Sequence, residues 1–220
     1  DYEVGGFGRI IDRLAAMTMP RAARAPFAAM KAEADAFAAQ FAQSQSPQHI
    51  WSFAGDPALV GAVRAAWPNA PAEADWMLDT LEQTLVINRH WVRGQGWASN
   101  HARAQFNRAN LRRYLAGERQ SPRVMFKFGA SHMVRGLSHT QVFDVGSQAA
   151  ELAEAMRKKS FHLLVLPGVG AQHARMNVQT WRYEPARAGA YSAGVPALAE
   201  AAFADAMSRI DLRPLRPLAF

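Results

Sequence analysis

Apolar residues recur at helical spacing through most of the first half of the chain. Capping signals support this pattern, because Asp56 precedes a proline at a first helical position, Asn100 can cap a further helix and Gly117 can close it. We therefore expect a helical subdomain over residues 20–117. The pattern predicts helices over residues 7–17, 26–43, 57–67, 72–92 and 100–115.

The pattern changes after Pro122. Residues 123–129 (RVMFKFG) and 161–166 (FHLLVL) are short apolar runs typical of buried strands, and an amphipathic helix is predicted between them over residues 145–159. A strand, a helix and a strand in this order form a βαβ unit, which implies a parallel pair with a right-handed crossover. Weaker strand signals occur at 178–183 and 207–212, on either side of a short helix at 196–204.

These elements predict an α/β fold with a parallel or mixed β-sheet flanked by helices and a large helical N-terminal portion. One domain over residues 1–220 accommodates them all. The opening DYEV, followed by two glycines, resembles the end of a strand and its turn, entered from preceding residues. We therefore expect an incomplete domain, whose first strand end carries Asp1 and Glu3.

Composition narrows the class of protein. The chain has 220 residues, half of them apolar, which suffices for one sizeable core. Every Ala-rich run is soon broken by a charge, so no membrane span is expected and we interpret the protein as soluble. It has no cysteine, which excludes disulfides, thiolate metal sites and a cysteine nucleophile, and fits the cytoplasm or the periplasm equally well. Oligomeric state is left open.

The positive charge is concentrated in one stretch. Residues 89–135 carry a local charge of +9, whereas the whole chain carries +7, so the remainder is slightly acidic. Such a field attracts anions and can steer them into a cleft. The alternatives are a solvated basic helix face or a nucleic-acid surface, but the aromatic residues here form no obvious stacking platform, so we expect no nucleic-acid partner. The basic residues are Arg89, Arg93, Arg103, Arg108, Arg112, Arg113, Arg119, Arg123, Lys127 and Arg135.

The stretch KFGASHMVRG follows the first predicted strand, where open parallel sheets bind ligands. His132 can exchange protons near neutral pH, and Arg135 and Lys127 add positive charge nearby. The alternative is a histidine that only ties down its loop. His139 and His162 match no standard metal pattern, and the common hydrolase and nucleotide-binding motifs are absent from the sequence.

Two segments resemble a known family. The helix RAQFNRANLRRYL (103–115) followed by RVMFKFGASH (123–132) is similar to the C-terminal half of erythromycin-esterase-like proteins, a group related to the haem-uptake ChaN-like proteins. In this resemblance Arg103, Asn110 and His132 fall on the family's arginine, asparagine and last motif histidine. Gly129 and Asn107 depart from the motif, and the family's N-terminal glutamate and histidine have no counterpart in the sequence.

The resemblance implies a metal-independent hydrolase of an ester or related bond in a small molecule, without a cofactor. His132 and a carboxylate would activate water, and Arg103 would stabilise the developing anion. Asp1 or Glu3 could supply that carboxylate, and Asn110, Arg135 and Lys127 would bind substrate. The alternative function is a binding protein on the same scaffold, which holds an anionic ligand such as a carboxylate, a phosphate or haem propionates in a basic cleft.

Overall fold

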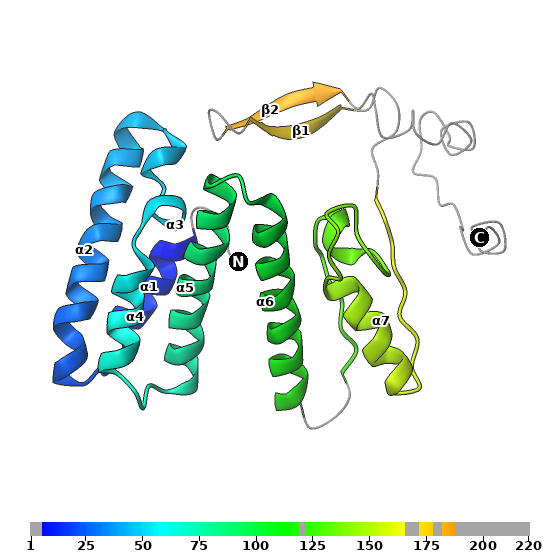
Figure 1. Cartoon of the computed structure of the whole chain (residues 1–220), viewed down its shortest axis with the longest axis horizontal. Helices are drawn as coiled ribbons and strands as arrows, with labels where there is room; N and C mark the ends of the chain where they lie inside the picture. The colour runs from blue at the N-terminus through cyan, green and yellow to red at the C-terminus, as the bar shows by residue number, and fades with distance from the viewer. Residues whose placement is uncertain (1–5, 119–121, 166–171, 178–181, 188–220) are drawn as a thin grey trace. The chain divides into compact units, whose positions relative to one another are not determined.

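The computed structural model describes residues 6–118, 122–165, 172–177 and 182–187, and the chain divides into two compact units, residues 1–162 and 163–220. The first unit is helical, and its helices can be followed along the chain in Figure 1. Its α-helices are α1 (Gly6–Ala15), α2 (Arg21–Ser44), α3 (Trp51–Ala54), α4 (Pro57–Ala66), α5 (Ala72–Val92), α6 (Gly96–Gly117) and α7 (Val145–Ala155), with short 3-10 turns η1 (Pro47–His49) and η2 (Ala130–Met133).

A single apolar core joins the first five helices. Leu14 of α1, Met30 of α2, Trp51 of α3, Val60 of α4 and Leu81 of α5 are all fully buried in it. Burial of side chains this large contributes roughly 1.5–3 kcal/mol each. The core therefore fixes the helices on which α6 packs.

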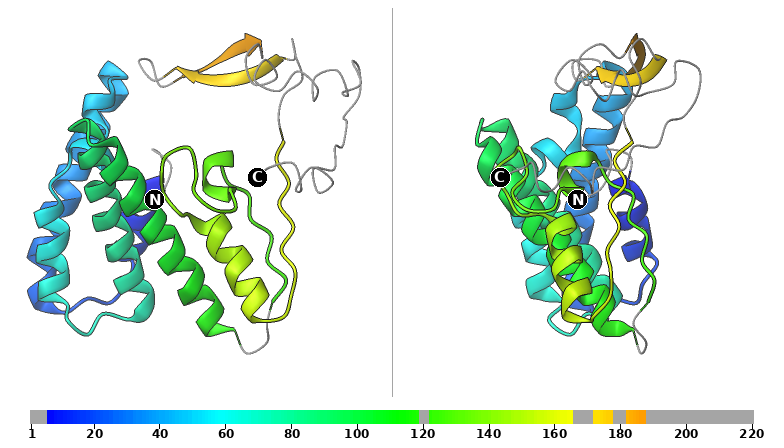
Figure 2. Two further views of the ribbon diagram at one scale, coloured as in Figure 1. Left: turned by 45° about the vertical axis from the view of Figure 1, so that its right-hand side comes forward. Right: turned by 90° about the vertical axis from the view of Figure 1, so that its right-hand side faces the viewer.

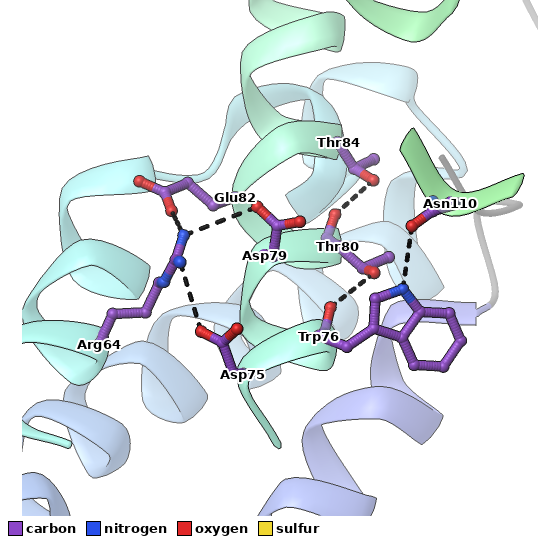
Figure 3. A network of polar contacts seen from close by, with 8 residues as sticks. All are labelled: Arg64, Asp75, Trp76, Asp79, Thr80, Glu82, Thr84 and Asn110. Carbon is purple, nitrogen blue, oxygen red and sulfur yellow. Dashed lines mark hydrogen bonds and ion pairs between the residues drawn. The ribbon is translucent and has the colours of Figure 1, made fainter. Parts of the chain in front are cut away.

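Hydrogen bonds and ion pairs tie α4 to α5 (Figure 3). The guanidinium of Arg64 on α4 contacts three carboxylates of α5: Glu82 at 2.6 Å, Asp75 at 3.4 Å and Asp79 at 3.7 Å. The hydrogen bond to Glu82 and the three negative charges raise the pKa of Arg64, against a smaller effect of burial. Helical spacing places the three acids on one face of α5.

The helices lie close to where the sequence predicted them, with differences at their ends. Asp56 caps α4 as predicted, since its side chain accepts a hydrogen bond from the Ala58 N–H. Helix α6 starts at Gly96, before the predicted Asn100 cap. Helix α7 ends at Ala155 and not at residue 159, because Arg157 takes the left-handed conformation (φ 54°), which interrupts a helix.

The predicted parallel or mixed α/β sheet is wrong. Residues 123–129 and the described part of the second run, 161–165, form no strand, and Met125 is 94% exposed. Within the described residues the sheet is one antiparallel pair in the second unit, β1 (Gln172–Asn177) and β2 (Arg182–Arg187). An apolar run of this length does not by itself specify a strand, because a strand also needs a neighbour to pair with its backbone.

The weaker strand signals have mixed outcomes. Residues 182–183 of the predicted strand 178–183 begin β2, which extends to Arg187. The predicted strand at 207–212, the helix at 196–204 and the opening DYEV lie outside the described residues. No helix in the described part of the chain is long and apolar enough to cross a membrane.

Candidate functional site

His132 is held by a buried carboxylate at the start of α7. Its Nδ1 lies 2.7 Å from Oδ2 of Asp144, which is 3% exposed. The other oxygen of Asp144, Oδ1, accepts a hydrogen bond from the Val145 N–H and so caps α7. The side chain of His132 keeps 26% of its surface accessible. The imidazole is therefore held by a hydrogen bond at Nδ1, while part of its surface remains accessible to solvent.

The loop that carries His132 is clamped onto α7. The Gly136 N–H donates to Ser147 Oγ at 2.6 Å, and the Ser147 hydroxyl donates to the Gly136 carbonyl at 2.9 Å. Gly146 sits directly against the Met133 backbone, where a Cβ atom would overlap it. These contacts fix the loop independently of the histidine, so the His132–Asp144 hydrogen bond is not the only attachment of the loop.

Arg103 of α6 belongs to the same group of charges. Burial lowers the pKa of its guanidinium, and the negative charge of Asp144 opposes that effect. An arginine stays protonated in spite of such a shift. Figure 2 shows α6, which carries Arg103, beside α7, the helix that Asp144 caps. The structure thus assembles a histidine, a carboxylate and a guanidinium from three segments.

The His132–Asp144 hydrogen bond sets the chemistry of the imidazole. A carboxylate can only accept, so Nδ1 carries the proton that it donates to Asp144. In the neutral ring Nε2 is then the proton acceptor. This is the arrangement in which a histidine acts as a general base.

A cavity of about 550 Å³ lies between α6 and the extended segment 123–128. Its apolar wall is formed mainly by Leu111, Met125, Phe126, Phe128 and Val145. Phe128 also meets the ring of His132 edge to face, with ring centroids 5.9 Å apart. The cavity is therefore adjacent to the histidine, although neither His132 nor Arg103 lines it.

The polar groups of the cavity come from α6 and from the start of the segment. Asn107, Asn110 and Tyr114 project from α6, and Arg123 from the segment. Among the described residues that line the cavity, Arg123 is the only charged one. Asn110 is also tied to α5, because its Oδ1 accepts a hydrogen bond from Trp76 Nε1 at 3.1 Å (Figure 3).

The sequence-predicted site residues are only partly brought together. Arg103 and His132 both lie near Asp144, and Asn110 lines the cavity. Lys127 and Arg135 are exposed and do not line it. Asp1 and Glu3, proposed as the carboxylate partner, lie outside the described residues.

Asp144 is the residue that sequence reasoning missed. Its signal was an aspartate directly before an amphipathic helix, the usual composition of a helix cap. A cap uses one carboxylate oxygen and leaves the other available, and the loop geometry turns that oxygen toward His132.

No family model, no curated protein and no solved structure matches this chain.

Proposed function

We infer that the protein hydrolyses an ester or related bond in a small molecule, with His132 as the general base. The observation that carries this proposal is the 2.7 Å hydrogen bond between His132 Nδ1 and the buried Asp144, next to a partly buried arginine. The resemblance of residues 103–132 to erythromycin-esterase-like proteins agrees with these roles.

In this proposal Nε2 of His132 accepts a proton from a water molecule whose oxygen attacks the ester carbonyl carbon. Asp144 holds the ring in the productive tautomer and stabilises the imidazolium that forms. Arg103 stabilises the negative charge on the carbonyl oxygen. The proton then passes to the leaving alkoxide, so water is added across the acyl carbon–oxygen bond and an acid and an alcohol are released.

The test is a comparison of His132→Ala with His139→Ala on a panel of small esters. Loss of a general base lowers kcat by about 10²- to 10⁴-fold. His139 lies in the same loop region, and its Nε2 contacts Ser131 Oγ at 3.4 Å, so its variant is the matched control. We expect loss of turnover in His132→Ala alone, and a cooperative thermal melt checks that this variant folds.

Two further variants separate the roles. Asp144→Asn keeps the size of the side chain but offers His132 an amide, so kcat should fall without a matching rise in KM. Arg103→Lys keeps the charge and loses the planar fork, and should also lower kcat. Unchanged turnover in His132→Ala would return the histidine to a role in anchoring the loop.

The second candidate function is that of a binding protein for an anionic ligand. The concentration of positive charge in residues 89–135 favours it, as does a cavity that His132 does not line. Such a protein would bind anions with equal affinity in the wild type and in His132→Ala, and would hydrolyse none of the esters. Titration with haem, followed by its absorption band, tests the haem-like ligand directly.

A further inference from the structure

We propose that the cavity between α6 and segment 123–128 binds an apolar ring that carries a carboxylate, and that this group forms part of the substrate. That the bound group is part of the substrate rests on the hydrolase function proposed above. Binding of the group in the cavity does not depend on that function and is tested separately.

The volume and the lining of the cavity support the apolar ring of the proposed ligand. Its volume of about 550 Å³ is within the range of small-molecule sites, which extends from about 300 to 1,000 Å³. Of its lining residues Leu111 and Val145 are buried, whereas Met125 and Phe128 are 94% and 45% exposed. A ring placed among these side chains would remove apolar surface of the exposed ones from water, which favours binding.

The positive charge of the lining supports the carboxylate of the proposed ligand. Arg123 is the only charged group among the described lining residues, and its planar fork matches a carboxylate in geometry. Asn107 and Tyr114 add neutral groups that can donate hydrogen bonds on the α6 side. A monoanion with an apolar body therefore complements the cavity better than a cation or a polyanion.

The position of Phe128 connects the cavity to the proposed reaction. The same ring lines the cavity and packs edge to face against the imidazole ring of His132. An ester group attached to the bound ring on the side of Phe128 would lie toward the imidazole, whereas the carboxylate would lie toward Arg123. The predicted substrate is thus a ring-containing carboxylic acid whose ring carries an esterified hydroxyl group, while its own carboxylate remains free.

Binding is tested by calorimetry with three probes: phenylbutyrate, the neutral phenylbutanamide, and acetate. We expect phenylbutyrate to bind more tightly than either of the others. Arg123→Gln should weaken phenylbutyrate about three- to tenfold, as expected for one partly exposed charge-assisted contact, and leave phenylbutanamide unchanged. Arg113→Gln removes the same charge from α6 outside the cavity lining and is the matched control.

A second variant tests the cavity itself. Asn107→Phe should fill the space and abolish binding of both ring-containing probes, and a thermal melt checks that the variant folds. Absence of phenylbutyrate binding to the wild type, or equal effects of Arg123→Gln and Arg113→Gln, would overturn the assignment of the cavity.

The reaction is tested with the acetate ester of hydroxyphenylbutyrate, whose hydrolysis adds hydroxyl to the acetyl carbon and a proton to the phenolic oxygen. Turnover that depends on both His132 and Arg123 is the expected result. Binding of phenylbutyrate without turnover would refute the hydrolase and leave the binding site standing. Turnover that depends on His132 and is indifferent to Arg123→Gln and Asn107→Phe would refute the substrate class and leave the hydrolase standing.

Discussion

Two helical glycines have opposite surroundings. Gly146, at the second position of α7, meets the backbone of Met133, whereas the nearest atom to a Cβ at Gly61 in α4 is Glu82 Oε1 at 4.0 Å. The first glycine is required by a close approach of two chain segments. The second is a weak helix former at which a Cβ atom would make only ordinary van der Waals contact.

We therefore predict that Gly146→Ala and Gly61→Ala change stability in opposite directions. Gly146→Ala should cost about 1–3 kcal/mol of unfolding free energy, because the backbone of the His132 loop must move. Gly61→Ala should raise it by up to about 1 kcal/mol through helix propensity. Urea denaturation measures both. A neutral Gly146→Ala variant would mean that the loop does not pack on α7 as described.

At single positions the sequence was informative where a local rule operates. The Asp56 cap and its proline are readable because capping involves neighbours in the chain. The pairing of His132 with Asp144 spans 12 residues and depends on the path of an irregular loop. No local rule reports that path, so the sequence alone does not identify Asp144 as the partner of His132.

At the scale of elements, the described ion pairs between α4 and α5 all involve one cation, Arg64. Arg64 faces three carboxylates of α5, and its side chain is 36% accessible, so solvent screens the interaction. Without Arg64 the three acids would repel one another along one helix face.

Arg64→Met should lower the unfolding free energy by about 1 kcal/mol or less, as for other partly exposed ion pairs. The loss should shrink in high salt, where charges are screened. Lys31→Met is the matched control, because Lys31 pairs with the single acid Asp35. Melting curves at low and high salt measure the effect, and a loss that is independent of salt would contradict an electrostatic cause.

Helices were predictable from the sequence and the sheet was not. A helix satisfies its own backbone, so the periodic apolar face of α5 suffices to identify it. A strand depends on a partner elsewhere in the chain, and the runs at 123–129 and 161–165 have none in the described residues. Their apolar composition predicts burial in a sheet, but Phe161 is 80% exposed.

At the scale of the whole molecule, the apolar core formed by the described residues lies in the first part of the chain. Every buried residue of the core cluster lies between Ile11 and Leu85, within the first unit. The stability of this core should therefore depend little on residues 163–220.

A chain that ends after His162 should keep the helical circular dichroism of α1–α7 and a cooperative melt within a few degrees of the full chain. A chain that ends after Asp79 loses Leu81 and Leu85 from the core and should not fold. Loss of cooperative melting in the longer fragment would show that the first unit needs the second.

The exposed run RVMFKFG has a consequence for the behaviour of the protein at high concentration. Short segments of high β-propensity and high hydrophobicity are the ones that stack between molecules into cross-β aggregates. Met125 and Phe128 are exposed to solvent, but Arg123 precedes them in the run and Lys127 lies between them. Charges in such positions act as gatekeepers, because stacked copies would bring like charges together. The two cations thus protect the colloidal stability of a chain whose apolar segment is uncovered.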